Sequence, residues 1–283
     1  MAINVIAHIQ KLLIKAGYQS QQLFYDALAL AQKVTGLASA QLLNTDFLLT
    51  GIQKQKLEKL VHELAVLHKP LQYILGSVPF GSLELFVQQP TLIPRPETEE
   101  WVHNLIIFLK DKNIKSILDI GTGTGCIALA LANALPEAQI VGVDIAPEAV
   151  VLARKNQEHN NIQNSTFLLS NLFESITGVF DIIVSNPPYI APKSYKTLSD
   201  TVKNWEDKNA LVAKNNGLWI LKKIITQARK HFTPPEGLLA LELGYDQADT
   251  CYTFMHSCGY TDIQVKKDFA NHHRVIMGRY SIE

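Results

Sequence analysis

The chain has 283 residues and no formal net charge, because 26 Lys and Arg balance 26 Asp and Glu. This balance argues against a protein that holds long duplex DNA by neutralising its phosphates, so stable nucleic-acid binding is not expected. The composition, 47% hydrophobic and 18% charged, is ordinary for a globular protein with a sizeable core.

The cysteines and the apolar runs indicate a compartment. Cys126, Cys251 and Cys258 form no CxxC pair, which supports neither a disulfide framework nor a zinc site, and no metal is expected. No apolar run approaches the length of a membrane span, and the N-terminus lacks a signal-peptide cleavage pattern. We therefore expect a cytoplasmic protein without a membrane partner, although the amphipathic, acid-poor N-terminus leaves weak organelle targeting open.

Residues 1–70 show apolar side chains at helical spacing and predict a small helical bundle. One helix ends at Gly17, a second has Ser20 as its N-cap and ends at Gly36, and a long one covers residues 53–68. The bundle contains no catalytic constellation, so we expect it to serve packing or partner recognition.

Residues 71–90 change character, because Pro79 and Gly81 interrupt short apolar pieces as in a hairpin. We interpret this stretch as a β-hairpin linker to a second domain over residues 91–283. That domain opens with a stiff loop around Arg95 and a helix whose first residue is Pro96. The loop is a helix start that also exposes a cation toward a site wall.

A cofactor motif follows. Residues 116–120 read as a buried strand, Gly121-Thr122-Gly123-Thr124-Gly125 as a tight glycine loop and residues 126–135 as a helix. A second strand over residues 139–143 ends in Asp144. This order of elements is the first half of a Rossmann-like unit, in which an acid after the second strand can bind both hydroxyls of a ribose.

The details of the loop favour one nucleotide over others. A dinucleotide fingerprint needs its third glycine where Cys126 stands, and there is no Walker A lysine. Asp119 precedes the loop and would repel a pyrophosphate, but it suits a cationic ligand such as the sulfonium of S-adenosylmethionine. The loop with Asp119 and Asp144 therefore indicates S-adenosylmethionine rather than NAD or ATP.

The remaining strands complete a parallel sheet. A strand over residues 166–169 leads to Asn171-Leu172-Phe173, where such folds commonly enclose the adenine, and a strand over residues 180–185 follows. We expect that strand beside the one over residues 116–120, so that both loops lie at the carboxyl edge where ligands bind.

The C-terminal residues are expected to close the sheet. They predict a helix over residues 218–232 and a strand over residues 238–243, in which Glu242 braces the site from below. A final antiparallel pair is expected over residues 260–265 and 274–278.

The loop Asn186-Pro187-Pro188-Tyr189 ends the strand over residues 180–185. Two prolines fix φ and remove two backbone donors, which makes the loop rigid. The Asn186 side-chain oxygen and the Pro187 carbonyl can together hold a planar –NH2 group by both hydrogens, and Tyr189 offers an aromatic face beside them. Alone, the loop could also be a simple proline-rich turn.

Together these motifs resemble a known family. Asp119-Ile-Gly-Thr-Gly-Thr-Gly125 with Asn186-Pro-Pro-Tyr189 is similar to class I amino-methyltransferases. Ile93-Pro-Arg-Pro-Glu-Thr-Glu99, the helical N-terminal part and Val202-x-x-Trp205-Glu206-x-x-x-Ala210-Leu211 are similar to the HemK/PrmC family, the N5-glutamine methyltransferases of peptide chain release factors. The resemblance covers nearly the whole chain.

The resemblance implies a fold, a reaction and a partner. The fold is a class I S-adenosylmethionine-dependent methyltransferase, a Rossmann-like seven-stranded α/β sheet with an N-terminal helical domain that recognises the release factor. The reaction is methylation of the glutamine in the Gly-Gly-Gln tripeptide of class I peptide chain release factors, with S-adenosylmethionine as donor.

The resemblance also assigns the residues. The expected cofactor-binding residues are Asp119, Gly121, Thr122, Gly123, Thr124 and Gly125 at the methionine part, Asp144 at the ribose, Leu172 at the adenine edge, and Asn186. The glutamine is expected to contact Asn186, Pro187, Pro188 and Tyr189, of which Asn186, Pro187 and Tyr189 are the catalytic residues.

Three departures and three alternatives stay open. Asn171 stands where many members of the family carry an acid, Asp207 stands where proline is usual, and Pro234-Pro235-Glu236-Gly237 is an unusual approach to the next strand. A nucleic-acid amino-methyltransferase needs the same acceptor loop, but neutral charge counts against it. An NAD-dependent oxidoreductase is disfavoured by Cys126 and Asp119, and an inactive binding module by the intact acceptor loop.

Overall fold

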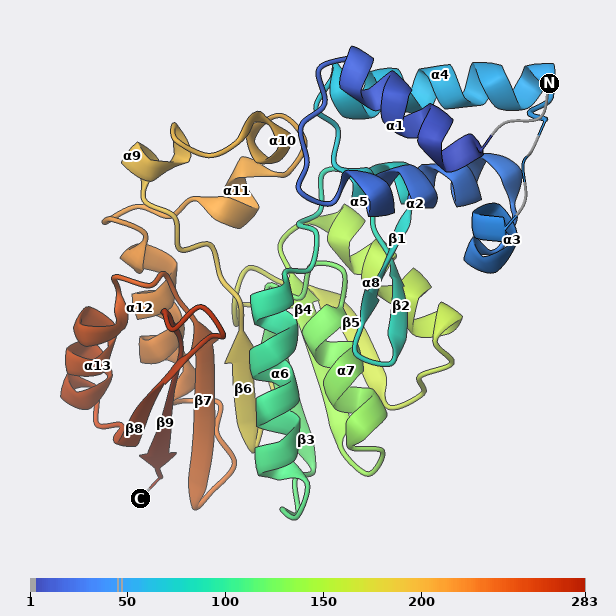
Figure 1. Ribbon diagram of the computed structural model, residues 1–283. Helices are drawn as coiled ribbons and strands as arrows, with labels where there is room; N and C mark the ends of the chain where they lie inside the picture. The colour runs from blue at the N-terminus through green and yellow to red at the C-terminus, as the bar shows by residue number, and fades with distance from the viewer. Residues whose placement is uncertain (1–3, 45, 47, 283) are drawn as a thin grey trace. The chain divides into compact units, whose positions relative to one another are not determined.

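The computed structural model describes residues 4–44, 46 and 48–282. The chain divides into two compact units, which are described separately (Figure 1). The helical unit spans Met1–Ser77 with Ser199–Trp205, and the sheet unit spans Val78–Leu198 with Glu206–Glu283. Among the described residues no helix is both long and apolar enough to cross a membrane.

The helical unit buries one apolar cluster between its helices. The described helices of this unit are α1 (Val5–Lys15), α2 (Leu23–Thr35), α3 (Ser39–Asn44), α4 (Gly51–Ala65), α5 (Leu71–Leu75) and α10 (Asp200–Lys203). Helix α4 begins earlier than the sequence pattern indicated, because Thr50 and Gln53 form a reciprocal capping box. The prediction of Ser20 as the N-cap of α2 was wrong, since Gln22 holds that position. The Ser20 hydroxyl instead accepts a hydrogen bond from the Gln22 N–H at 3.0 Å.

Residues 199–205 join the helical unit although they are distant from it in sequence. The Trp205 indole N–H donates to the Leu67 carbonyl at 3.1 Å, and the Lys69 ammonium lies 5.5 Å from the centre of the Trp205 ring. A cation over an indole face is attracted to its π electrons, so Trp205 fastens this short segment to the end of α4.

The sheet unit is built on seven strands in the order β5-β4-β3-β6-β7-β9-β8 (Figure 1). They are β3 (Ser116–Ile120), β4 (Gln139–Asp144), β5 (Ser165–Leu169), β6 (Ile182–Ser185), β7 (Glu236–Glu242), β8 (Thr261–Lys267) and β9 (His273–Ser281). Strands β3 to β7 are mutually parallel, whereas β9 runs antiparallel to both of its neighbours. The predicted antiparallel pair at the end of the chain is therefore confirmed.

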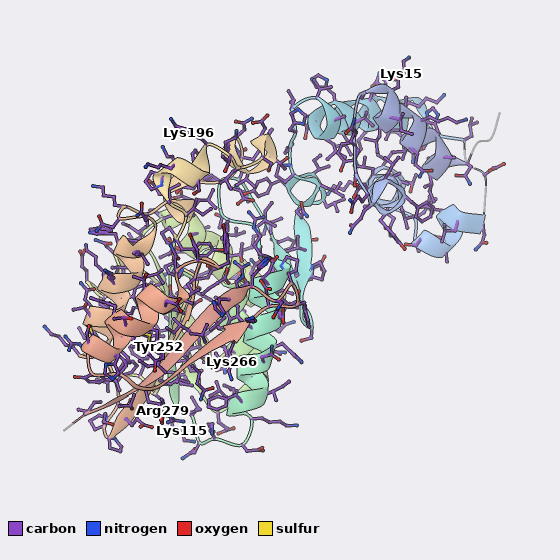
Figure 2. All side chains as sticks on the ribbon, turned by 60° about the vertical axis from the view of Figure 1, so that its left-hand side comes forward. Lys15, Lys115, Lys196, Tyr252, Lys266 and Arg279 are labelled. Atoms are coloured by element: carbon purple, nitrogen blue, oxygen red, sulfur yellow. The ribbon has the colours of Figure 1, made fainter. Side chains whose placement is uncertain are left out.

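Helices cover both faces of the sheet. Side chains from α6 (Pro96–Leu109), α7 (Cys126–Ala134) and α8 (Pro147–His159) share one core with alternate strand residues. Those from α12 (Leu218–Ala228) and α13 (Ala248–Ser257) form the second core. Successive side chains of each strand point alternately into the two cores, as in parallel strands that are buried on both faces. Cations such as Lys115, Lys196 and Lys266 lie exposed on the outside of the unit (Figure 2).

Two short segments complete the sheet unit. Strands β1 (Ser77–Phe80) and β2 (Leu83–Phe86) pair as a two-stranded sheet within the predicted linker. The buried Asn156 side chain of α8 accepts from the Phe86 N–H at 2.7 Å and donates to the Thr124 carbonyl at 2.9 Å. Short helices α9 (Pro192–Tyr195) and α11 (Lys208–Leu211) lie between β6 and α12.

Candidate active site

A cavity of about 530 Å³ lies at the carboxyl edge of the central strands. Strands β3 and β6 are parallel neighbours with Ile120 opposite Ser185, so the loops that follow them leave the sheet side by side. The glycine loop and the Asn186 loop both line this cavity, as do the ends of β4 and β5. The predicted adjacency of the two loops at the carboxyl edge is confirmed by this register.

The glycine loop has a backbone that only glycine adopts readily. Gly123 and Gly125 have φ angles of 56° and 82°, in the left-handed region that penalises residues with a Cβ. The Gly123 N–H donates to Asp144 Oδ2 at 2.9 Å, which fastens the loop to the end of β4. Thr122 and Thr124 are buried and contribute to the cavity wall.

Asp144 lines the cavity with a carboxylate fixed by backbone donors. Its Oδ1 accepts from the Ala146 N–H and its Oδ2 from the Gly123 N–H, both at 2.9 Å. Burial raises the pKa of the carboxyl above its usual value, and the backbone hydrogen bonds oppose that rise. Each carboxylate oxygen can accept a further hydrogen bond, so Asp144 can bind a pair of hydroxyl groups.

Asp119 lies beneath the glycine loop and does not belong to the cavity wall. The Thr122 hydroxyl donates to its Oδ2 at 2.6 Å. Burial raises the pKa of Asp119 to about 7, although the hydrogen bond from Thr122 lowers it. Asp119 can therefore influence a ligand only through its charge, and that charge changes near neutral pH.

The loop after β5 presents Leu172 with a φ of 53°, an uncommon conformation for a bulky side chain. The Ser170 hydroxyl donates to the Leu172 carbonyl at 2.9 Å and accepts from the Ser175 N–H at 3.0 Å, which holds the turn. Asn171 donates from Nδ2 to Glu174 at 2.8 Å, leaving its Oδ1 as an acceptor at the cavity wall.

The Asn186 side chain is held by a chain of hydrogen bonds that ends on Glu242. Its Nδ2 donates to the Thr98 hydroxyl at 3.1 Å, and that hydroxyl donates to Glu242 Oε2 at 2.6 Å. The Trp101 indole N–H donates to the same oxygen at 2.8 Å, and the Tyr189 hydroxyl donates to Oε1 at 3.2 Å. Burial raises the pKa of Glu242, and these donors oppose the rise.

The other end of the loop is held through its backbone. The Tyr189 carbonyl accepts from Gln247 Nε2 at 2.9 Å, and the same nitrogen donates to the Asn216 carbonyl at 3.1 Å. Gly217 packs so closely that a Cβ there would lie 1.8 Å from the Tyr189 carbonyl oxygen. The Tyr189 side chain packs against the second core and is not part of the cavity wall.

Two contacts beside the cavity connect the segment before α6 with the segment before α11. The Asp207 N–H donates to the Pro90 carbonyl at 2.8 Å, and Arg95 forms an ion pair with the buried Glu206 at 2.5 Å. Proline, the residue expected at position 207 from the resemblance, could not donate this bond. The Asp207 side chain also caps α11 by accepting from the Asn209 N–H at 2.9 Å.

The structure brings most of the predicted site residues to one cavity. The wall includes Gly121, Thr122, Gly123, Thr124, Asp144, Leu172, Asn186, Pro187 and Pro188, whereas Asp119, Gly125 and Tyr189 lie behind it. Sequence patterns missed three residues that support the loop, namely Thr98, Gly217 and Gln247. Of the three, only Thr98 could have been noticed from sequence, because it lies inside the Pro-Glu-Thr-Glu stretch that carries the family resemblance.

This fold and this site define a class I methyltransferase that uses S-adenosylmethionine. Residues 102–223 match the Methyltransferase small domain family, and residues 4–76 match the PrmC N-terminal domain family. A methyltransferase from Pyrococcus furiosus and the hMettl16 catalytic domain share the fold, with TM-scores of 0.53 and 0.57. The Pyrococcus furiosus protein is 20% identical, and the match covers 71% of this chain and 91% of that one. The hMettl16 domain is 17% identical, and the match covers 80% of this chain and 82% of that one.

Relatives with known names narrow the class. The release factor glutamine methyltransferase of Salmonella typhimurium is 42% identical over 234 residues, which cover 82% of this chain and 83% of the relative. The protein of the same name from Escherichia coli is 38% identical over 257 residues, or 90% of this chain and 91% of the relative. The chain belongs to the release factor glutamine methyltransferase family.

Proposed function

We propose that this protein transfers a methyl group from S-adenosylmethionine to the side-chain nitrogen of the glutamine in the Gly-Gly-Gln tripeptide of class I release factors. The observation that carries the proposal is the shared cavity, in which a glycine loop and an Asn-Pro-Pro-Tyr loop leave adjacent parallel strands. Family membership with release factor glutamine methyltransferases supports the choice of substrate.

The cavity residues fit the proposed methyl donor. The Asp144 carboxylate is suited to the two ribose hydroxyls, the glycine loop to the methionine part and Leu172 to the adenine edge. Thr122 and Thr124 are buried side chains of the glycine loop that form part of the cavity wall beside the proposed methionine site. S-adenosylmethionine, when bound, supplies an electrophilic methyl group on a positively charged sulfur.

Asn186 and Pro187 are the proposed acceptors for the glutamine –NH2 group. An amide nitrogen is a poor nucleophile because its lone pair is delocalised into the carbonyl. Two hydrogen bonds, to the Asn186 side-chain oxygen and the Pro187 carbonyl, would fix that nitrogen and increase its electron density. Positioning of this kind contributes about 7–11 kcal/mol in favourable cases.

Proton removal needs no side-chain base in this proposal. The Asn186-Pro187-Pro188-Tyr189 loop contains no group that is basic at neutral pH, and burial raises the pKa of Tyr189 further. The neutral nitrogen would form a bond to the methyl carbon as the carbon–sulfur bond breaks, so that S-adenosylhomocysteine leaves as a neutral thioether. The proton would then leave the nitrogen for water. Tyr189 stiffens the loop through Glu242 and helps to exclude water.

The helical unit is the proposed recognition domain for the release factor, because it has a core of its own and its described residues include no catalytic constellation. The reaction is placed in the cytoplasm, where release factors act and where free thiols such as Cys126 and Cys251 persist. Stable nucleic-acid binding is not part of the proposal, since the chain has no net positive charge.

The test combines the purified protein with labelled S-adenosylmethionine and three substrates: a class I release factor, its Gly-Gly-Gln→Gly-Gly-Ala variant, and duplex DNA. Mass spectrometry locates the methyl group. We expect one methyl on the glutamine of the release factor and none on the variant or the DNA. Methylated DNA with an unmodified release factor would reject the substrate and leave the fold and the donor unaffected.

Asn186→Ala tests the acceptor role in the same assay. We expect S-adenosylmethionine to bind with nearly unchanged affinity by calorimetry, while single-turnover methylation falls by at least about 100-fold, as when a positioned hydrogen-bonding group is removed. Near-normal turnover by Asn186→Ala would show that another group holds the amide.

A further inference from the structure

We infer that Thr98 and Glu242 are positioning residues that hold the Asn186 side-chain amide in one of its two flip orientations. In that orientation Nδ2 faces Thr98 and Oδ1 faces the proposed position of the substrate –NH2 group. The inference rests on the proposed function, because the orientation matters only for a substrate that presents an –NH2 group. Both residues act through Asn186 and not by contact with the reacting atoms.

The direction of each hydrogen bond follows from the number of protons. The Trp101 indole N–H can only donate, so Glu242 Oε2 acts as an acceptor toward it. The Trp101 N–H and the positive charge of Arg274 favour the ionised form of Glu242 against the effect of burial, and an ionised carboxylate accepts only. The Thr98 hydroxyl lies 2.6 Å from the same oxygen. The single hydroxyl proton of Thr98 is therefore used by Glu242.

Thr98 can then only accept from Asn186. The hydroxyl oxygen lies 3.1 Å from the Asn186 amide, and without a second proton it requires a donor there, which is Nδ2. The other end of the planar amide is Oδ1, which consequently points away from Thr98. A rotated amide would bring two acceptors together at Thr98 and would offer –NH2 to the –NH2 of the substrate.

Burial and further contacts make this arrangement rigid. Thr98 and Glu242 are each 1% exposed, so water cannot replace the missing partners in the rotated state. Glu242 Oε1 accepts from the Tyr189 hydroxyl, so one carboxylate fixes both the first and the last residue of the acceptor loop. A buried polar network of this kind is stable only when every member is satisfied.

The test replaces Thr98 by valine, which has the same shape but cannot accept, and by serine, which can. The substrate is a release factor, and the donor is S-adenosylmethionine. For Thr98→Val we expect the single-turnover rate to fall about tenfold, the effect of losing one hydrogen bond in the reacting geometry. S-adenosylmethionine affinity should stay within twofold, and Thr98→Ser should recover most of the rate.

Controls separate orientation from general structural damage. Thr226→Val is the matched variant, because the Thr226 hydroxyl donates only to the Lys222 carbonyl of its own helix, and it should behave like the wild type. A rate for Thr98→Val equal to that of the wild type would overturn the inference and leave the proposed function intact. A wild-type protein that leaves the glutamine unmodified would instead overturn the proposed function.

A second measurement does not depend on the folding of any Thr98 variant. In protein labelled with ¹⁵N-asparagine, the side-chain –NH2 signal of Asn186 is assigned by its absence from Asn186→Ala. We expect one of its two protons to be protected from exchange with solvent, because it is bonded to the buried Thr98 oxygen. Equally fast exchange of both protons would overturn the inference.

Discussion

Gly217→Ala tests how firmly the acceptor loop depends on a close backbone approach. A Cβ at position 217 would lie 1.8 Å from the Tyr189 carbonyl oxygen and 2.5 Å from Gln247 Nε2. Since ordinary contacts to carbon need roughly 3.5–4 Å, the Tyr189 carbonyl must move by more than about 1 Å. The displaced backbone belongs to the same loop as Asn186, only three residues away.

The energetic consequences of Gly217→Ala can be estimated. Gly217 has a φ of 85°, and an alanine in this region costs about 1–2 kcal/mol. Breaking the Gln247–Tyr189 hydrogen bond leaves a buried group unsatisfied, which costs about 1–3 kcal/mol more. We expect the free energy of unfolding to fall by about 3 kcal/mol and, because a displacement of about 1 Å can cost 100-fold, turnover to fall by about that factor.

Gly259→Ala is the matched control for Gly217→Ala. Gly259 has nearly the same φ, 89°, but a Cβ there would meet only the Tyr280 ring, at 3.5 Å. Gly259→Ala should lower the free energy of unfolding only by the cost of the left-handed backbone, about 1 kcal/mol, and should leave turnover unchanged. Urea unfolding and single-turnover methylation measure both effects. Equal losses of stability and of turnover in the two variants would refute the argument, because the clash at position 217 would then have no consequence.

Four further predictions concern the residues at the proposed cofactor site and the Arg95–Glu206 ion pair. Asp144→Ala should weaken S-adenosylmethionine binding at least about tenfold by calorimetry, because a charged hydrogen bond is worth about 1.5–3 kcal/mol; unchanged affinity would mean that the ribose is bound elsewhere. Asp119, with a pKa of about 7, should make that affinity rise between pH 6 and 8, since only its ionised form attracts the sulfonium, and Asp119→Asn should flatten the profile. The same raised pKa means that protonated Asp119 stabilises the fold in acid and that this contribution is lost as the pH rises through about 7. Arg95→Ala leaves the buried Glu206 carboxylate unpaired, so the free energy of unfolding in urea should fall by about 3 kcal/mol. The double variant, Arg95→Ala with Glu206→Gln, should recover part of this loss because it removes the unpaired charge. Additive losses in the double variant would contradict the ion-pair argument.

The motifs of this site could be predicted from sequence because each is local. A β-branched strand, a glycine loop and an apolar helix follow one another over residues 116–135, and a parallel sheet requires loops to leave at its carboxyl edge. The proline-stiffened loop at Asn186 is likewise contained in four residues. Element ends were predicted less well: the N-cap of α2 is Gln22, two residues after the predicted Ser20.

The supporting contacts could not be predicted, because they join distant parts of the chain. Thr98 meets Asn186 across 88 residues, and Glu242 lies 144 residues from Thr98. No periodicity relates such positions, since their contact depends on how α6 packs against the sheet. The sequence predicted that Asp119, just before the glycine loop, acts on the cofactor. Only the packing decided that this side chain lies buried behind the cavity wall.

The sequence by itself determined the class of fold, the order of the parallel strands around the two loops and the chemistry that those loops can offer. It did so because hydrophobic periodicity, glycine and proline act on the backbone over a few residues. Only the tertiary structure decided which way the Asn186 amide points. That orientation is set by one hydroxyl proton between Thr98 and Glu242, and burial is what makes the alternative orientation unfavourable.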